Sequence, residues 1–425
     1  MNPIRSNTYL LLCLLMVFPL WVLPLHAQVY PEDYLEEALH NNPGLRAMQL
    51  AYEASVQRED VASALPDPVL SGGVFTPPMK RLMGNQWVDA GVMQMFPWFG
   101  TLQKQGEAAG KMAEGAYHQY RENRNQLFFE LTRKWLGIYK VDRQQRILSR
   151  FIEVLKERED LVYIRYEGGS QRTGLPLDIY RLQIQLSDLE NRMAKLDEER
   201  ISLIKSFNIL AGREELAGVD IPSGLPGPGE GHVGLAEDKN GFEGNPLLHL
   251  SRARADEADI QKEVARLKTR PTLGLGLQYA YFEPGSAAMG QMDGGHMLMP
   301  MVSVSLPVFR KKNEASRRQS QLLAESARLL ETNQSEALET KWVQLEAGLQ
   351  NLRRDHDFYQ RQRDIILKAW DLVLTAYAGG EEGFDDLLQI QDQLLDLEWR
   401  LLETNVNHHL TRAEMDMLQA INIFE

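Results

Sequence analysis

The sequence predicts a mainly helical protein with four membrane-type β-strands, built as two copies of one helix–strand–strand–helix–helix unit. Three observations lead to this fold class. Two very long runs contain no proline and keep a helical hydrophobic period, and four shorter segments alternate in hydrophobicity as strands do. The same short motifs also recur in the same order in both halves of the chain, which indicates an internal duplication.

Residues 1–27 are predicted to form a secretory signal peptide. Arg5 precedes an apolar run over residues 10–25, and Ala27 supplies a small residue at the expected cleavage point. A membrane anchor is the alternative, but two prolines interrupt the run, and it is shorter than the ~20 residues that a spanning helix needs. Because the one cysteine, Cys13, lies inside this signal, we expect no disulfide and no cysteine nucleophile in the mature chain.

The repeats are marked by matching motifs. Asn42-Pro43 recurs as Asn245-Pro246, and Pro68 recurs as Pro271 at the same interval. The interval is longer between Pro97 and Pro307, which predicts a longer hairpin in the second copy. We therefore divide the mature chain as follows: a first repeat over residues 28–211, a connector rich in glycine and proline over 212–244, and a second repeat over 245–425.

The helical segments have complementary lengths. The runs 101–165 and 310–378 could each span roughly 100 Å as continuous helices. Within each repeat, the two shorter helical segments together nearly match one long helix, which predicts pairs of short helices stacked end to end beside it. The second long helix also carries a seam of apolar residues that is typical of coiled coils: Ala327, Leu330, Ala337, Trp342, Leu345, Leu349, Leu352, Phe358, Ile365, Ile366, Trp370 and Leu374.

Strands are predicted at about residues 68–76, 88–97, 271–283 and 297–308. In the third strand, large side chains such as Leu275 alternate with small residues such as Gly276, which is the pattern of membrane barrel strands. A soluble β-sandwich would show the same alternation. The signal peptide and the aromatic residues near the strand ends favour the barrel, and since four strands cannot close one, several chains must share it.

Taken together, the motifs resemble those of the TolC-like family of outer-membrane efflux ducts over essentially the whole mature chain. The resemblance rests on the repeated NP motifs, the paired hairpins, the strand exits FPWFG and LPVFRKK, and the two YxGG motifs. It implies a homotrimer whose chains share a twelve-stranded outer-membrane β-barrel, continued by a long α-helical barrel. It also implies that loops 76–87 and 284–297 face the exterior of a Gram-negative cell.

The resemblance assigns roles to several groups of residues. Periplasmic gate candidates are Asp178, Asp386, Glu382 and Gln389; Gln389 and Glu382 depart from the family pattern, which has an aspartate and often an arginine there. The tip turns that would dock the periplasmic adaptor contain Tyr166, Gly168, Gly169, Gly174, Tyr377, Gly379 and Gly380. The junction between barrel and tunnel contains Pro97, Trp98, Phe99, Gly100, Pro307 and Phe309.

Asp178 and Asp386 also have a simpler interpretation. Each lies at the start of a predicted helix, where a negative charge interacts favourably with the helix dipole. Both interpretations stay open at the level of the sequence.

The implied function is passive conduction from an inner-membrane pump of the RND type, through an adaptor, to the cell exterior. A periplasmic coiled-coil scaffold and a duct for type I protein secretion are the alternatives. The net charge of -13 argues against a nucleic-acid partner, and no convergent nucleophile, base and orienting group indicates an enzyme. We expect no cofactor and assign no metal site.

The cargo is left open by the sequence. Strand parity puts five methionines on the face with small residues: Met93, Met95, Met297, Met299 and Met301. Thioether sulfur suits Cu(I) or Ag(I), which makes heavy-metal efflux one hypothesis. Methionine is also an adaptable packing residue, so drugs, other small molecules and polypeptides stay open as cargo.

Overall fold

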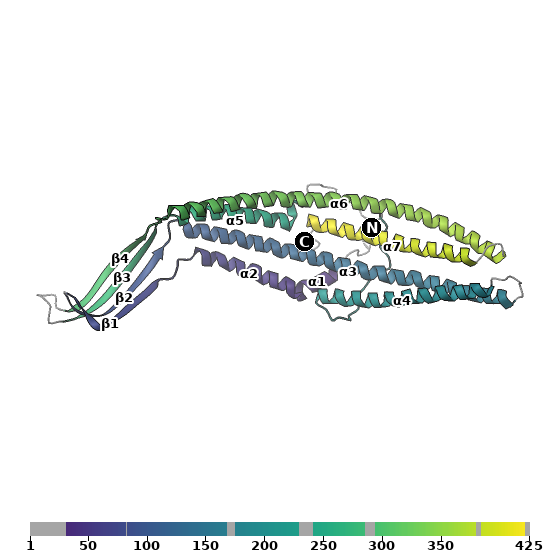
Figure 1. Ribbon diagram of the computed structural model, residues 1–425, viewed down its shortest axis with the longest axis horizontal. Helices are drawn as coiled ribbons and strands as arrows, with labels where there is room; N and C mark the ends of the chain where they lie inside the picture. The colour runs from purple at the N-terminus through teal and green to yellow at the C-terminus, as the bar shows by residue number, and fades with distance from the viewer. Residues whose placement is uncertain are drawn as a thin grey trace, which may run out of the picture.

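The chain forms a long, narrow molecule with a small sheet at one end and helices running away from it (Figure 1). The computed structural model describes residues 31–81, 83–167, 175–228, 241–284, 294–379 and 384–420. The predicted signal peptide, residues 1–27, lies outside these described residues. We call the helix ends that are farthest from the sheet the tip.

Two uninterrupted helices run along most of the molecule. α3 (Thr101–Glu167) has 67 residues and α6 (Arg310–Gly379) has 70, so each is about 100 Å long. The prediction of two very long helices is therefore confirmed. None of the helices in the described ranges is both long and apolar enough to cross a membrane.

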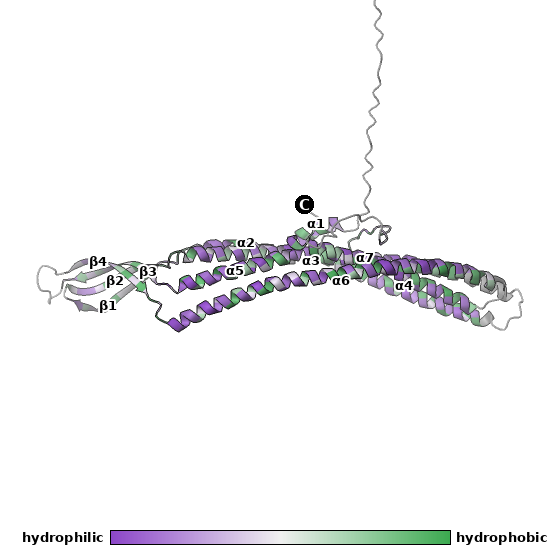
Figure 2. Cartoon of the chain, turned by 90° about the horizontal axis from the view of Figure 1, so that it is seen from above, coloured by the Kyte–Doolittle hydropathy of each residue, from purple (hydrophilic) through white to green (hydrophobic). Residues whose placement is uncertain are grey.

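The shorter helices complete a single layer. They are α1 (Glu32–Asn41), α2 (Pro43–Ser63), α4 (Leu175–Ala211), α5 (Pro246–Lys268) and α7 (Phe384–Gln419), with a 3-10 turn, η1 (Gly241–Gly244), before α5. α2 and α4 follow one another along one side of α3, while α5 and α7 follow one another between α3 and α6 (Figure 1). The predicted end-to-end stacking is confirmed. Seen from above, the layer is curved, and polar and apolar residues alternate along its helices (Figure 2).

The two NP motifs form the joints between the stacked helices. Asn42 caps α2 by accepting a hydrogen bond from Leu45 N, and its amide donates to the Leu210 carbonyl at the end of α4, 3.0 Å away. Asn245 caps α5 in the same way and donates to the Leu418 carbonyl of α7 at 2.7 Å. At each joint, one asparagine side chain thus bonds a free backbone N–H at the start of one helix and a free carbonyl at the end of another. The following proline suits the first helical position, where no N–H is needed.

Replacing Asn245 with alanine is expected to lower the free energy of unfolding by about 1–2 kcal/mol, because the cap of α5 and the bond to α7 are lost together. Asn245→Asp keeps the capping oxygen and removes the amide donor, so this variant should lose less stability than the alanine variant but should be less stable than the wild type. Thermal unfolding midpoints of the purified variants would measure both. An alanine variant as stable as the wild type would contradict the role of the joint.

The coiled-coil seam on α6 is partly as predicted. Trp342, Leu345 and Leu349 are buried against neighbouring helices, and the seam continues towards the tip at intervals of three and four residues. Leu330, Phe358 and Ile365 were expected in this seam, but they are 62%, 47% and 65% exposed. None of the described helices buries these three side chains, although Leu330 borders a groove shared with α3 and α5 and Ile365 borders a hollow shared with α7.

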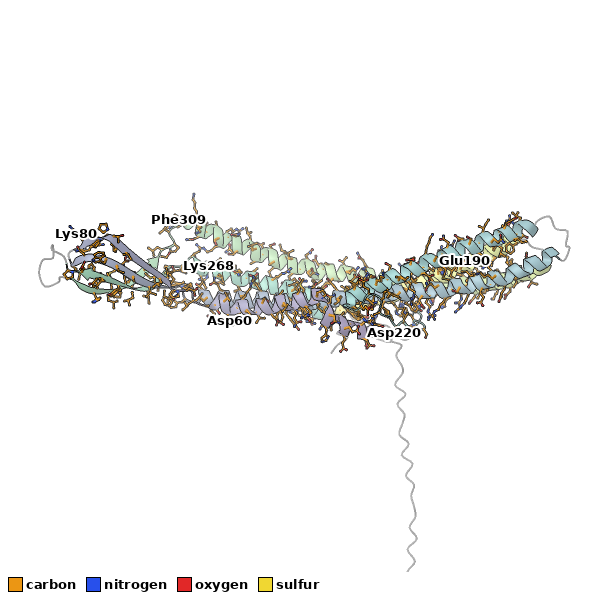
Figure 3. All side chains as sticks on the ribbon, turned by 90° about the horizontal axis from the view of Figure 1, so that it is seen from below. Asp60, Lys80, Glu190, Asp220, Lys268 and Phe309 are labelled. Atoms are coloured by element: carbon orange, nitrogen blue, oxygen red, sulfur yellow. The ribbon has the colours of Figure 1, made fainter. Side chains whose placement is uncertain are left out.

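The described part of the connector, residues 212–228, crosses the helices at mid-height, where Asp220 is labelled in Figure 3. Trp135 of α3 donates to the Asp220 carbonyl at 2.9 Å, and Asp220 N donates to the Tyr34 hydroxyl of α1 at 2.7 Å. Ile221 and Leu225 pack against the adjacent apolar core. The connector therefore fastens α1 to the middle of α3.

The sheet contains the four predicted strands, all antiparallel. They are β1 (Val69–Arg81), β2 (Gly84–Phe96), β3 (Thr272–Glu283) and β4 (Gly295–Ser305), in the spatial order β1-β2-β3-β4. The two repeats meet between β2 and β3. Neither β1 nor β4 pairs with a further strand among the described residues, so both sheet edges carry open backbone groups.

The first hairpin differs from the prediction. Residues 76–87 were expected to form a loop, but β1 continues to Arg81 and β2 begins at Gly84. Successive N–H groups of a strand point to opposite sides, so an edge position explains only one of the two prolines, Pro77 and Pro78. Both are tolerated because β1 is an edge strand and its pairing with β2 is interrupted between Val74 and Met79. In the second predicted loop, residues 285–293 lie outside the described residues.

Candidate functional site: the helical tip and the strand-to-helix junction

The tip brings α4 and α7 together through polar side chains from both repeats. Arg181 of α4 approaches Asp385 of α7, with 2.8 Å between Nη1 and Oδ2, and it lies 3.6 Å from Asp178 one turn earlier. One turn further along α4, the Gln185 amide donates to Asp392 of α7 at 2.6 Å. We call these four residues, Arg181, Gln185, Asp385 and Asp392, the tip bridge.

The sequence did not point to the tip bridge. Asp385 directly precedes the candidate Asp386, and Arg181 follows Asp178 at the spacing of a helical ion pair. However, the pairing joins residues about 200 positions apart, and it depends on side chains of α4 and α7 reaching each other at the tip. Local spacing alone could not supply that information.

The predicted gate residues occupy different positions at the tip. Asp178 is half-buried in the first turn of α4, and Asp386 is exposed in the first turn of α7. Gln389 is exposed on the next turn of α7, and Glu382 lies outside the described residues. The helix-start positions of both aspartates agree with the dipole interpretation, and a gate role for them stays a prediction.

The predicted tip turns are described only in part. Tyr166 is the second-last residue of α3, and Tyr377 and Gly379 lie in the last turn of α6. The Tyr377 ring is buried with its centroid 5.8 Å from that of Phe384, which begins α7, so it packs the end of one helix against the start of the next. Gly168, Gly169, Gly174 and Gly380 lie outside the described residues. The docking role of these turns stays a prediction.

Asp392 is the carboxyl of the tip bridge whose pKa is raised. Desolvation between α4 and α7 raises the pKa of its carboxyl; nearby Asp188 adds to the rise, while Arg192 and the Gln185 amide oppose it. A carboxyl whose folded-state pKa is raised favours the folded contact in its protonated form. Its contribution is therefore present at low pH and is lost as pH rises through the raised pKa.

We expect the contact between α4 and α7 to tighten on acidification and to loosen as Asp392 ionises. Asp392→Asn mimics the neutral carboxyl, so this variant should hold the contact closed with a weaker pH dependence. Hydrogen exchange of residues 184–190, measured across the acidic range, would report the contact. An unchanged pH profile in Asp392→Asn would rule out this carboxyl as the responsive group.

At the other end of the helices, the first junction turns sharply from β2 into α3. Gly100 has a φ of 78°, a left-handed conformation that favours glycine, and Thr101 N donates to the Trp98 carbonyl at 3.0 Å. Phe99 is 80% exposed, beside the half-buried Trp98 ring. The turn thus sends the chain into the long helix and leaves an aromatic ring at the surface.

The second junction turns the chain from β4 into α6 without a glycine. Val308 N donates to the Leu306 carbonyl, and the Asn313 side chain of α6 donates back to the Pro307 carbonyl at 3.1 Å. Phe309 is 73% exposed and points away from the helices (Figure 3). Both junctions therefore place a proline and an exposed phenylalanine where a strand becomes a helix.

The sheet has two chemically different faces. Register places Val92, Leu277 and Pro300 side by side on one face, together with other large apolar residues that are mostly exposed. The opposite face carries glycines, polar side chains and the five methionines, so the predicted parity is confirmed. Gln94, which interrupts the apolar face, bonds the Pro66 carbonyl at 2.7 Å, so its amide is satisfied at the end of the sheet.

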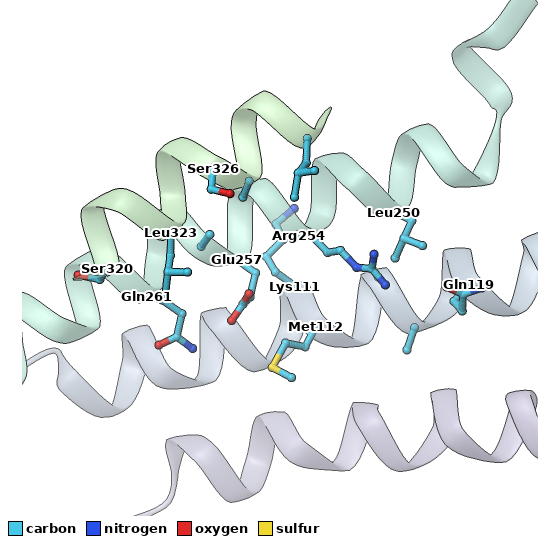
Figure 4. A pocket seen from close by; sticks show the side chains of 15 residues that line it. Lys111, Met112, Gln119, Leu250, Arg254, Glu257, Gln261, Ser320, Leu323 and Ser326 are labelled. Carbon is cyan, nitrogen blue, oxygen red and sulfur yellow. The ribbon is translucent and has the colours of Figure 1, made fainter. Parts of the chain in front are cut away.

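A groove of about 690 Å³ lies between α3, α5 and α6 in the half of the helices nearer the sheet (Figure 4). Leu250 and Leu323 line it together with Arg254 and Glu257. It does not bring together a nucleophile, a base and an orienting group. In the part of the chain that the structure describes, no group of three or more His, Cys, Asp or Glu residues is positioned to hold a metal ion.

The α3–α5 contact beside this groove carries buried titratable groups. The ring of His118 stacks on that of His249 with centroids 4.8 Å apart, and burial, His249 and Arg121 lower the pKa of His118. One turn away, burial raises the pKa of Glu122. Both shifts favour the neutral forms, so burial in this contact favours an uncharged imidazole at His118 and an uncharged carboxyl at Glu122.

No family model matches the sequence, and no curated protein matches it at a significant level. Solved structures do match. CusC, described for folding and transmembrane channel formation, shares 15% identity with a TM-score of 0.77, and 92% of each chain is covered.

Two further matches agree with this one. The outer-membrane protein VceC of Vibrio cholerae has a TM-score of 0.74 at 14% identity, covering 92% of this chain and 96% of that one. The open state of the MtrE outer-membrane channel of Neisseria gonorrhoeae has a TM-score of 0.73 at 16% identity, covering 92% and 89%. These proteins are outer-membrane proteins and channels, not enzymes. The chain has the fold of the TolC-like outer-membrane efflux channels.

Proposed function

We propose that this protein is the outer-membrane exit duct of a tripartite efflux system and that it works as a homotrimer. The observation that carries the proposal is the pair of open apolar edges of the helical layer. On one edge, the free stripe of α6, Phe358, Ile365 and Leu372, repeats every seven residues, with Ile365 and Leu372 65% and 73% exposed. A heptad stripe of this kind suits another helix.

The opposite edge offers a matching surface. α2 and α4 form it (Figure 1), and Leu50, Val61 and Ile184 on these helices are 62%, 74% and 70% exposed. A contact between the α6 edge of one copy and the α2–α4 edge of the next is heterologous, and such contacts form closed rings when the rotation between copies closes. Three curved layers would then enclose a helical tunnel.

The sheet supports the same assembly. Its edges, β1 and β4, each present open backbone groups, and pairing β4 of one copy with β1 of the next satisfies both. Three copies of four strands give a twelve-stranded barrel, with the exposed apolar face towards lipid and the face with glycines and methionines towards the lumen. Trp87, Phe99 and Phe309 then suit the membrane interfaces.

This assembly puts the protein in the outer membrane of a Gram-negative bacterium, with its tip in the periplasm. There the tip would meet an adaptor protein and an inner-membrane pump of the RND type. The acidic helix starts of α4 and α7 would ring the entrance in three copies and favour cations. The tip bridge and the predicted residues Asp178 and Asp386 are our candidates for its gate.

Reconstitution tests the proposal. The mature protein should require detergent for extraction from outer membranes, should behave as a trimer, and should conduct ions in planar lipid bilayers. Extraction without detergent as a soluble monomer would contradict the duct and favour the scaffold alternative.

A further inference from the structure

Methionines gather on one face of the sheet, where strand register aligns them with glycines. Met93 of β2 is paired with Gly276 of β3, which is paired in turn with Met301 of β4. Met95 is likewise paired with Gly274, which is paired with Ser303. Two rows of paired residues therefore cross the sheet, each with a glycine in the middle. In one row the glycine lies between two methionines, and in the other it lies between a methionine and a serine.

The sulfur atoms of β2 lie over the glycines. A Cβ added at Gly274 would lie 2.8 Å from Met95 Sδ and 3.2 Å from Met93 Sδ, so the two sulfur atoms are no farther apart than the sum of these distances. The same Cβ would lie 2.2 Å from Ser303 Oγ, and Ser303 Oγ is 3.8 Å from Met93 Sδ. Two thioethers and a hydroxyl thus share the space that a side chain at Gly274 would fill.

Met301 lies across Gly276 from Met93, in the row next to Gly274. Adjacent strands lie roughly 5 Å apart, so Met93 and Met301 flank Gly276 across about 10 Å with no side chain between them. Met93 already leans over Gly276, since its Cε and Sδ are 2.9 and 3.1 Å from a Cβ added there. A flexible methionine at 301 can reach this position by a change of rotamer.

We propose that Met93, Met95 and Met301 form a thioether site that binds one soft monovalent cation, Cu(I) or Ag(I), in each chain. Thioether sulfur selects soft cations over Zn²⁺, Mg²⁺ or Na⁺. The half-buried side chains keep the site accessible from one face of the sheet. The inference rests on the proposed function in one respect, because that function turns this face towards the lumen, where a passing cation would meet it.

A packing role and a binding role for these methionines predict different results. Leucine fills the same volume as methionine at little cost, so a face that needed only filler would be equally stable with leucine. The substitution of methionine by leucine therefore separates the two roles, because it keeps the packing and removes the sulfur.

The test uses the detergent-purified trimer, silver nitrate and a chloride-free buffer, with isothermal titration calorimetry as the measurement. We expect one Ag(I) per chain. The Met93→Leu/Met95→Leu double variant should bind at least tenfold more weakly, while Met48→Leu on α2, which changes an exposed methionine far from the sheet, should bind as the wild type does. Excess Zn²⁺ or Na⁺ should not displace the bound silver.

Absence of silver binding by the wild type would overturn the site, and so would undiminished binding by the double variant. The thermal unfolding midpoint of each variant confirms that it is folded. The same preparation is tested for conductance: a trimer that conducts ions but binds no silver loses this site and keeps its role as a duct. A protein that binds silver but does not conduct loses the proposed duct and keeps the site.

Discussion

Ile365→Glu is expected to abolish the homotrimer. Ile365 is 65% exposed in the single chain, at the centre of the free stripe of α6, and the proposed assembly buries it against the neighbouring copy. Burying an unpaired carboxylate costs several kcal/mol, and the ring repeats that cost at three contacts. Size-exclusion chromatography with light scattering, in detergent, would show monomers in place of trimers.

Leu216→Glu provides the matched control. Leu216 is 69% exposed in the connector, so the change introduces the same charge at a similarly exposed leucine that belongs to none of the helices of the layer. This variant should stay trimeric. If Ile365→Glu also stayed trimeric, the free stripe would not be the contact between copies. The observation on which the proposed homotrimer rests would then no longer support it.

Arg181→Ala is expected to open the tip. It removes the contact to Asp385 across α4 and α7 and the contact to Asp178 within α4. An exposed ion pair is worth about 0.2–1 kcal/mol, so its loss in three copies shifts the balance between closed and open tips by up to roughly a hundredfold. Single-channel recordings should show a larger open fraction, and cells should become more permeable to large antibiotics.

Arg133→Ala is the control for this change. Arg133 pairs with Glu130 one turn earlier on the same helix, so its loss breaks an ion pair without separating α4 from α7. Conductance should stay at the wild-type level. An Arg181→Ala channel with an unchanged open fraction would exclude the tip bridge from gating and return attention to Asp178 and Asp386.

The sequence was a good guide to the helices and a weaker one to the contacts between them. The long helices were predictable because proline is missing from both runs and present at each start. Strand parity was also predictable, because a period of two assigns each side chain to a face regardless of the strand's partner. The two faces of the sheet, including the methionine face, follow from this.

The errors have physical causes. The first strand was predicted to end at about residue 76, but β1 continues through Pro77 and Pro78 to Arg81 as an edge strand, a property of the whole sheet that its own residues do not reveal. Phe358 and Ile365 were assigned to the seam because they are apolar at nearly the right spacing, although the described helices leave them 47% and 65% exposed. The tip bridge was missed because it joins α4 of the first repeat to α7 of the second. Matching motifs between the repeats shows that the two units are alike, but it does not show which of their residues are in contact.

The asparagine joints have a mechanical consequence for the helical layer. Continuous helices alternate with jointed ones, and both joints are held by single side chains, Asn42 and Asn245. α3 and α6 therefore supply the stiffness along the tunnel, while the stacked pairs give each half of the layer its own short helices. Rotation of α4 and α7 at the tip would strain these two joints, the bonds of both helices to α3 and α6, and the bend of the long helices. The short helices near the sheet, α2 and α5, could keep their positions while the tip moves.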